Sequence, residues 1–287
     1  MARLKDLKTV GVAGSGLMGS GIAQVAAMSG YEVLLLDVSK AQLEKAVSSM
    51  TSSLEKLVQK EKISENQKTE TLKRIKITTD MKTFSTADLV VEAATENPKV
   101  KLELFRQLDQ ICGARTILVS NTSSIPITRL AAVTARPDKV AGMHFMNPVP
   151  LMKLVEGIRG FKTSDATFEV VRKFAESMGK TFIESKDSPA FVVNRILVPM
   201  LNEAVFALQE GLATQEDMDT AMKLGCNFPM GPFELLDYVG LDTALAIMEV
   251  MHQETGDSKY RPCTLLRKYV EAGHYGRKNG KGFYDYT

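Results

Sequence analysis

The chain has 287 residues, of which 24% are charged, and its formal net charge at pH 7 is only +2. This length predicts two domains, each large enough for a core of its own. The small net charge argues against nucleic acid or a membrane surface as partner. The first eight residues do not resemble a signal peptide and no apolar run is long enough to span a bilayer, so we expect a cytoplasmic protein.

The first predicted elements form one βαβ unit around a glycine-rich turn. An apolar strand over residues 8–13 leads into Gly-Ser-Gly-Leu-Met-Gly at 14–19, and a helix over 20–29 follows. A second strand over 31–36 ends at Asp37. Gly-x-Gly-x-x-Gly between a strand and a helix, with an acidic residue after the second strand, is typical of Rossmann dinucleotide-binding domains. A glycine-rich turn without a ligand is the weaker alternative.

Each part of this turn has a physical task. Gly14 makes the turn, Gly16 lets the backbone approach a pyrophosphate, and Gly19 lets the helix pack closely on the strand. The helix N-terminus offers unpaired N–H groups to the phosphates. Asp37 can accept hydrogen bonds from ribose hydroxyls and repels a 2′-phosphate, and no arginine follows it, so the sequence favours NAD over NADP. FAD shares this fingerprint and is the main alternative cofactor.

A basic insertion follows, over residues 40–76. It contains nine Lys or Arg against five Glu and predicts two helical stretches, residues 40–60 and 66–74, the second with Ser64 as N-cap. It is far longer than the roughly two to six residues that an ordinary αβ loop needs. Ser53, Lys56 and Lys60 have the spacing of one helix face. Spacing alone favours a solvated face, and the alternative is a binding surface for a polyphosphate tail.

The βα pattern then resumes and completes an α/β sheet. Further strands are predicted over residues 75–78, 88–94, 116–120, 139–144 and 182–185. Helices are predicted over residues 100–110 and 167–178. The strand over residues 88–94 has a continuous run of apolar residues, as parallel strands buried on both faces do.

Polar residues follow several of these strands at their carboxyl ends. In an open α/β sheet the ligand binds along this edge. We therefore expect one crevice to contain residues that are scattered in the sequence, namely Gly14, Asp37, Glu96, Ser123 and His144.

His144 is one of only three histidines, and Glu156 follows it twelve residues later. Pro148 and Pro150 force a bend between them, so the two side chains can be neighbours across a tight turn. A histidine paired with a carboxylate is the usual way to build a proton acceptor for neutral pH. A histidine beside an apolar strand is by itself more often structural, and here the surrounding site residues favour the catalytic interpretation.

Beyond residue 188 the pattern becomes all-helical. Apolar residues with helical spacing run from Leu197 to Leu212 through Pro199, which is expected to kink the helix. Thr214 with Asp217 resembles a capping box, and further helices are predicted near residues 235, 244–254 and 265–272. We therefore predict a Rossmann-type doubly wound sheet over residues 1–188 with a helical arm at 40–76, and an all-helical substrate and dimerisation domain over residues 189–287. A homodimer through the helical domain is expected.

The cysteines are Cys112, Cys226 and Cys263. They are odd in number, far apart and without Cys-x-x-Cys spacing. We expect three buried, reduced thiols and neither a disulfide framework nor a metal site.

With these motifs, the chain resembles the short-chain L-3-hydroxyacyl-CoA dehydrogenase family, which includes the 3-hydroxybutyryl-CoA dehydrogenases. The resemblance covers nearly the whole length, through the motifs at residues 14–19, 91–97, 120–124, 144–150, 194–195, 230–237 and 280–284. One departure is Pro189-Ala190-Phe191, where the family has Pro-Gly-Phe. The extra methyl group constrains the backbone there but affects no catalytic position.

The resemblance implies an NAD-dependent oxidoreductase that interconverts (S)-3-hydroxyacyl-CoA and 3-oxoacyl-CoA, with the four-carbon 3-hydroxybutanoyl-CoA and acetoacetyl-CoA as the expected pair. It implies that His144 is the general base and that Glu156 fixes its tautomer. Ser123 and Asn194 match positions that bind the substrate oxygens or position the histidine.

The resemblance also implies two binding sets. Ser53 and Lys60 match contacts to the CoA nucleotide, which favours the polyphosphate interpretation of the arm, with Lys56 on the same face. The cofactor set comprises Gly14, Gly16, Leu17, Met18, Gly19, Asp37, Glu96, Lys101, Ser123 and Asn147. No metal is expected.

Three alternatives carry less weight. A dinucleotide-binding sensor has no need of Ser123, His144, Glu156 and Asn194 together. A serine hydrolase would need a Gly-x-Ser-x-Gly elbow, which is missing. The 6-phosphogluconate and β-hydroxyacid dehydrogenases use a catalytic lysine instead of a histidine–glutamate pair.

Overall fold

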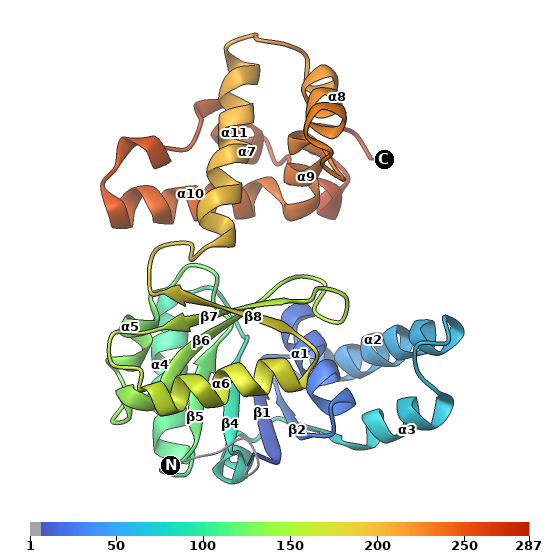
Figure 1. Ribbon diagram of the computed structural model, residues 1–287, viewed down its shortest axis with the longest axis vertical. Helices are drawn as coiled ribbons and strands as arrows, with labels where there is room; N and C mark the ends of the chain where they lie inside the picture. The colour runs from blue at the N-terminus through green and yellow to red at the C-terminus, as the bar shows by residue number, and fades with distance from the viewer. Residues whose placement is uncertain (1–6, 287) are drawn as a thin grey trace. The chain divides into compact units, whose positions relative to one another are not determined.

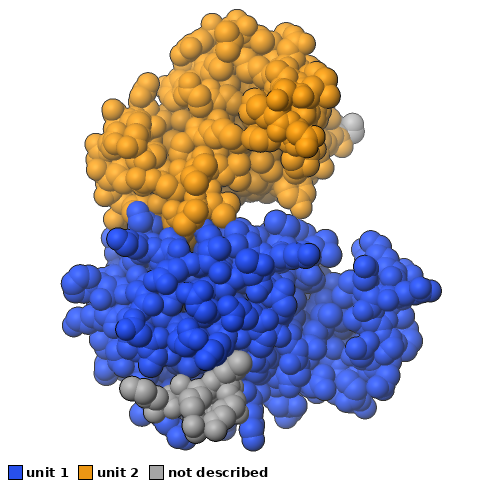
Figure 2. All heavy atoms as spheres, in the orientation of Figure 1, with its two compact units in different colours: residues 1–188 blue, residues 189–287 orange. Residues whose placement is uncertain are grey.

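The computed structural model describes residues 7–286, and the chain divides into two compact units between Ser188 and Pro189 (Figure 2). The first unit contains one eight-stranded sheet in the order β3-β2-β1-β4-β5-β6-β7-β8. Its strands are β1 (Thr9–Ala13), β2 (Glu32–Leu36), β3 (Ile75–Thr78), β4 (Leu89–Glu92), β5 (Ile117–Ser120), β6 (Val140–Phe145), β7 (Leu154–Arg159) and β8 (Thr181–Lys186). The predicted doubly wound α/β sheet is confirmed, and each predicted strand is present.

Helices cover the sheet because its strands are apolar on both faces. One core joins β1 to α1 (Leu17–Met28) and α6 (Asp165–Ser177), and α6 lies across the sheet in Figure 1. Shorter segments are 3₁₀ turns, among them η2 (Met81–Thr86). The other helices of this unit are α2 (Lys40–Gln59), α3 (Glu65–Lys73), α4 (Pro98–Ile111) and α5 (Ile127–Ala131).

Strand direction places the chemistry at one edge of the sheet. β1 pairs in parallel with β2 on one side and with β4 on the other, and β5 and β6 extend the parallel order. The carboxyl ends of these five strands therefore lie along the same edge, and the order reverses between β1 and β4, where such sheets bind their ligands.

β7 was not predicted, and it is the strand that reverses direction. It pairs antiparallel with β6 and parallel with β8. Glu156 and Gly157 interrupt its apolar pattern, which is why the sequence does not read as a strand. Gly157 is required by packing, because a Cβ atom there would lie 1.8 Å from the Phe182 ring.

The basic arm consists of α2 and α3, which extend away from the sheet in Figure 1. Leu43, Ala46 and Met50 on the first half of α2 join the sheet core. At the start of α3, Ser64 Oγ accepts from Gln67 N and the Gln67 side chain accepts from Ser64 N, so the predicted N-cap is a full capping box.

The second unit is all-helical, with a core that includes Leu201, Phe233 and Met248. Thr214 caps α8 as predicted. The Asp217 side chain accepts from the Thr214 hydroxyl and not from the Thr214 backbone N–H, which a capping box would require. Leu212 lies beyond α7 and is 77% exposed, so its predicted core position is wrong. The helices are α7 (Val193–Gln209), α8 (Gln215–Cys226), α9 (Pro232–Val239), α10 (Leu241–Thr255) and α11 (Thr264–Glu271).

Two buried carboxylates fasten the C-terminal tail to these helices. Asp237 accepts from Phe283 N at 2.8 Å and Tyr284 N at 2.9 Å, and Asp219 accepts from the Tyr284 hydroxyl at 2.9 Å. A Cβ atom on Gly282 would lie 2.0 Å from Asp237 Oδ1, so only glycine fits there. The motifs at residues 230–237 and 280–284 thus hold the second unit together.

The departure at residue 190 has a backbone cost. Ala190 and Phe191 have φ angles of 65° and 53°, in the left-handed region that glycine adopts most readily. The methyl group of Ala190 therefore strains this turn, where the resemblance implies a glycine. Among the described residues, no helix is long and apolar enough to cross a membrane.

The prediction of three buried thiols is wrong for Cys226. Cys112 and Cys263 are buried, whereas Cys226 is exposed at the end of α8. Burial raises the pKa of the Cys112 thiol to about 11. Because the thiolate is the reactive form, Cys112 is protected by its protonation state as well as by its position.

We expect a single thiol to react rapidly with a disulfide reagent at pH 8 in the native protein. All three should react after denaturation, and Cys226→Ser should remove the rapid phase without changing the slow one. Time-resolved absorbance of the released chromophore measures this. Rapid reaction of two thiols in the native protein would contradict the buried positions of Cys112 and Cys263.

Candidate active site

His144 and Glu156 are brought together by the antiparallel pairing of β6 with β7, in which they are directly opposite each other. His144 Nδ1 lies 2.6 Å from Glu156 Oε2, and His144 Nε2 lies 2.9 Å from the Ser123 hydroxyl oxygen. Glu156 is fully buried and His144 is 5% exposed. Three side chains from two strands and one loop therefore form a single hydrogen-bonded line.

The direction of these hydrogen bonds follows from their chemistry. An ionised carboxylate can only accept, so Glu156 selects the tautomer of His144 with its proton on Nδ1. The lone pair then lies on Nε2, on the side of Ser123. Such an imidazole can take a proton at Nε2, and the carboxylate behind it stabilises the imidazolium that results.

Ser123 belongs to a loop that hydrogen-bonds to the side chain of Glu96. The loop follows β5, and one oxygen of Glu96 accepts from Ser123 N at 2.7 Å and from the Thr122 hydroxyl at 2.6 Å. The same oxygen accepts from the backbone and hydroxyl of Ser124, each at 3.1 Å. Glu96 is thus a backbone anchor for the residue that meets His144.

Lys101 is buried next to two carboxylates. Its side chain is 2% exposed, and its ammonium binds both oxygens of buried Glu92, at 2.7 and 2.6 Å. The same ammonium is 3.5 Å from Glu96. The Lys101 ammonium therefore contacts two carboxylates, Glu92 and Glu96, next to the loop.

The glycine-rich turn has the geometry of a dinucleotide cradle. Gly14 has φ +100°, and a Cβ atom there would lie 2.6 Å from Ala93 O. A Cβ atom on Gly19 would lie 1.9 Å from Gly14 O, so helix and turn pack too closely for any side chain. At Gly16 a Cβ atom would meet nothing within 4 Å, which leaves open space beside the backbone.

Asp37 stands at the end of β2 beside this turn. It accepts from the backbone N–H and the hydroxyl of Ser15, both at 2.8 Å, and from Ser39 N at 3.0 Å. Partial burial would raise the pKa of Asp37, but these hydrogen bonds outweigh it and hold the pKa below its ordinary value. The carboxylate is therefore charged at neutral pH and able to repel a 2′-phosphate.

A cavity of about 750 Å³ opens next to Gly14, Gly16 and Asp37. Its walls are mostly apolar and suit a flat heterocycle, with polar groups at the rim. The turn, the carboxylate and this cavity together fit a dinucleotide. The sequence did not single out the wall residues from η2 and α4, which are Met81, Val100, Leu104 and Gln107.

The remaining predicted residues are distributed over both units. Leu17 is 70% exposed at the start of α1, Met18 is half-buried, and Asn147 is exposed in the connection between β6 and β7. Asn194 lies in the first turn of α7, in the second unit. On the arm, Ser53 is half-buried and Lys56 and Lys60 are exposed.

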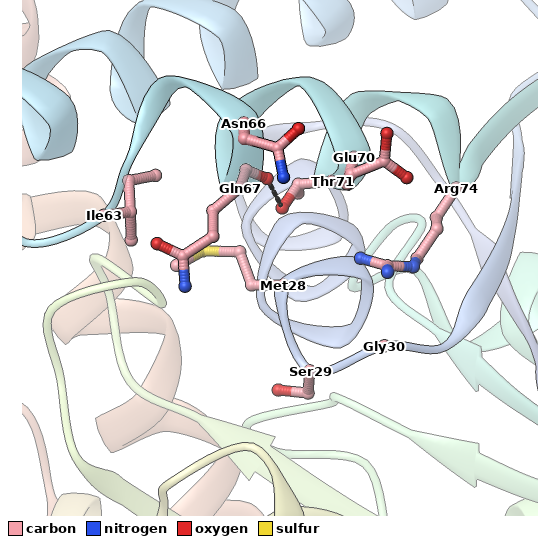
Figure 3. A pocket seen from close by; sticks show the side chains of 9 residues that line it. All are labelled: Met28, Ser29, Gly30, Ile63, Asn66, Gln67, Glu70, Thr71 and Arg74. Atoms are coloured by element: carbon pink, nitrogen blue, oxygen red, sulfur yellow. Dashed lines mark hydrogen bonds between the residues drawn. The ribbon is translucent and has the colours of Figure 1, made fainter.

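A second cavity, of about 520 Å³, lies between α3 and the C-terminal end of α1 (Figure 3). Arg74 and Glu70 reach into it from α3, opposite Met28. α1 starts at the carboxyl ends of the strands and runs antiparallel to them. Its C-terminal end therefore lies at the opposite edge of the sheet, away from His144. This cavity therefore contributes nothing to the site. Within residues 7–286, no group of three or more His, Cys, Asp or Glu side chains could hold a metal ion.

Two family models match the chain. Residues 9–188 match the NAD binding domain of 3-hydroxyacyl-CoA dehydrogenase, and residues 191–286 match its C-terminal domain. The chain therefore belongs to the 3-hydroxyacyl-CoA dehydrogenase family and is an oxidoreductase that uses NAD, as the sequence predicted.

Individual relatives agree over almost the full length. The chain is 53% identical over 281 residues to the probable 3-hydroxybutyryl-CoA dehydrogenase of Bacillus subtilis, covering 98% of each protein. It is 48% identical over 288 residues to the human mitochondrial hydroxyacyl-coenzyme A dehydrogenase, covering 98% of this chain and 91% of that protein. The crystal structure of (S)-3-hydroxybutyryl-CoA dehydrogenase from Ralstonia eutropha superposes with a TM-score of 0.95 at 52% identity, covering 98% of this chain and 99% of that one.

Proposed function

We propose that the protein interconverts (S)-3-hydroxyacyl-CoA and 3-oxoacyl-CoA, with 3-hydroxybutanoyl-CoA and acetoacetyl-CoA as its four-carbon pair. The observation that carries the proposal is the line Glu156–His144–Ser123, with distances of 2.6 and 2.9 Å. Several relatives are named 3-hydroxybutyryl-CoA dehydrogenase, which supports the substrate class.

His144 serves as general base in this proposal. Nε2 takes the proton of the substrate 3-hydroxyl, and Glu156 stabilises the imidazolium through Nδ1–H. Ser123 shares Nε2 with the substrate oxygen and keeps the ring oriented between turnovers. In the reverse direction the imidazolium returns the proton to the 3-oxo oxygen.

The cofactor supplies the hydride chemistry, since NAD accepts a hydride from C3 and NADH returns it. Gly14, Gly16 and Gly19 would hold its pyrophosphate and Asp37 its ribose. The proposed cofactor set also keeps Leu17, Met18, Glu96, Lys101, Ser123 and Asn147.

The second unit would supply Asn194, as a hydrogen-bond partner for a substrate oxygen or for His144. We assign the substrate and dimerisation role to residues 189–287 and the NAD-binding role to residues 1–188. Free thiols, with no disulfide among residues 7–286, fit a cytoplasmic location.

The arm would bind the nucleotide end of CoA. Lys56 and Lys60 are exposed near the end of α2. Other lysines of the arm form ion pairs, such as Lys68 with Glu65 at 3.0 Å. Exposed ammonium groups in the last turn of a long helix can reach phosphates without a large desolvation cost.

The wild-type protein should oxidise NADH in the presence of acetoacetyl-CoA and be much slower with NADPH, because Asp37 repels the 2′-phosphate. His144→Gln should lower kcat by about 10² to 10⁴, the usual contribution of a general base. Loss of absorbance at 340 nm measures both.

NADH titration of His144→Gln, followed by fluorescence, is the control, and its Kd should equal that of the wild type. The mechanism would be wrong if the variant kept near-normal turnover. Turnover with NADPH at the NADH rate would leave the reaction intact and overturn the role of Asp37.

Lys56→Gln combined with Lys60→Gln should raise the KM for acetoacetyl-CoA about fivefold at low salt, with little change in kcat, because about 1 kcal/mol of attraction is removed. The KM for acetoacetyl-pantetheine, which lacks the nucleotide, should not change. Lys162→Gln with Lys173→Gln, which removes two exposed charges outside the arm, is the matched control. An equal rise in KM for both substrates would contradict nucleotide binding by the arm.

We expect a homodimer formed through the second unit. Ile196 on α7 is 69% exposed, and with the half-buried Leu197 and Met200 it offers an apolar surface that a partner subunit could cover. Sedimentation should give about twice the 31.5 kDa chain mass, and Ile196→Glu should shift the equilibrium toward monomer. Leu224→Glu, at an exposed position on α8, is the control, and a monomeric wild type would exclude the dimer.

A further inference from the structure

Two buried charges lie beneath the loop that carries Ser123. The side chains of Glu92, at the end of β4, and Lys101, on α4, are 0% and 2% exposed. Removing one partner of such a pair is strongly destabilising, whereas replacing both with neutral groups of similar size is often tolerated. Stability therefore gives little reason for a buried ion pair here, and its connections suggest another role.

One side of the pair is connected to the loop through Ser120. The Ser120 hydroxyl donates to Glu92 Oε2 at 2.6 Å and accepts from Thr122 N at 3.1 Å. Glu92 Oε1 accepts from Ala94 N at 2.9 Å, so both carboxylate oxygens are used. The end of β5 and the second residue after β4 are thus tied to one buried carboxylate.

The other side is connected through Glu96. The Lys101 ammonium is 3.5 Å from Glu96 Oε2, and Glu96 Oε1 accepts from Ser123 N. A single cation therefore contacts both of the carboxylates that bind the loop. Without that cation the two like charges would repel each other, and the exposed one could move toward solvent with the loop.

We propose that Glu92 and Lys101 are positioning residues, which hold residues 120–124 in the conformation that places the Ser123 hydroxyl 2.9 Å from His144 Nε2. Nothing in the resemblance assigns a role to Glu92, and for Lys101 the positioning role comes in addition to its place in the proposed cofactor set. The inference rests on the proposed function, because it acts through Ser123 on the general base.

A double-mutant cycle tests whether the pair acts through Ser123. Glu92→Gln with Lys101→Met removes both charges at similar volume, and it is measured in the wild-type and Ser123→Ala backgrounds. In the wild-type background kcat should fall about tenfold or more, as expected for a misplaced catalytic group. In the Ser123→Ala background the same change should lower kcat by less than about twofold.

The KM for NADH separates positioning from direct cofactor binding. It should change by less than about twofold in Ser120→Ala, which breaks the link between Glu92 and the loop but leaves Lys101 in place. A large rise in this KM would overturn a role confined to positioning. Glu169→Gln with Lys173→Met, an exposed pair on α6 at 3.2 Å, makes the same chemical change elsewhere and should leave kcat unaltered.

An equal loss of kcat in both backgrounds would overturn the positioning role while leaving the dehydrogenase activity of the wild type in place. Wild-type protein that fails to reduce acetoacetyl-CoA would instead overturn the proposed function. If thermal melts show that the charge-removed variant does not fold, Ser120→Ala replaces it in the same cycle. That change removes the hydroxyl that links Glu92 to Thr122 N and leaves both charges in place. It should lower kcat several-fold, again only where Ser123 is present.

Discussion

The antiparallel pairing of β6 with β7 is the constraint on which the site depends. Opposite residues of neighbouring strands lie within about 5.5 Å of each other, and this register places His144 opposite Glu156. A slip of one residue would turn Glu156 to the other face of the sheet. Gly157 protects the register, since the Phe182 ring occupies the space of its missing side chain. Strand pairing thus positions the two side chains, which would otherwise need a rigid loop to hold them.

Buried charge is the second constraint at this edge of the sheet. Glu92, Glu156 and Lys101 are each almost fully buried, and a buried charge is tolerated only when it is paired and hydrogen-bonded. Glu92 meets this requirement with Lys101, Ser120 and Ala94 N. Glu156 meets it with His144. Each buried carboxylate therefore orients the side chain that pairs with it. The hydrogen bonds that offset the cost of burial are the same ones that order the site.

The sequence was sufficient for the features that depend on local patterns. The glycine turn, the parallel strands and the Ser64 cap follow from periodicity and residue type, and all are present. Features that depend on long-range pairing were less accessible. β7 was missed because a functional carboxylate interrupts its apolar pattern, and the walls of the dinucleotide cavity come from η2 and α4, which carry no motif. Ser120 lay inside a recognised motif, but its partner Glu92 is 28 residues away, and no spacing rule relates them.

The motifs that define the family separate into two physical kinds. Those at residues 14–19, 120–124 and 144–150 meet at the carboxyl edge of the sheet, where in the proposed mechanism they serve cofactor binding and proton transfer. Those at 230–237 and 280–284 meet at Asp237, whose carboxylate accepts two backbone N–H groups of the tail. Leaving such groups unpaired in a core would cost roughly 1–3 kcal/mol each. A motif shared by relatives therefore does not by itself mark a catalytic residue. The distinction comes from what the side chain binds, and in Asp237 it binds the chain's own backbone.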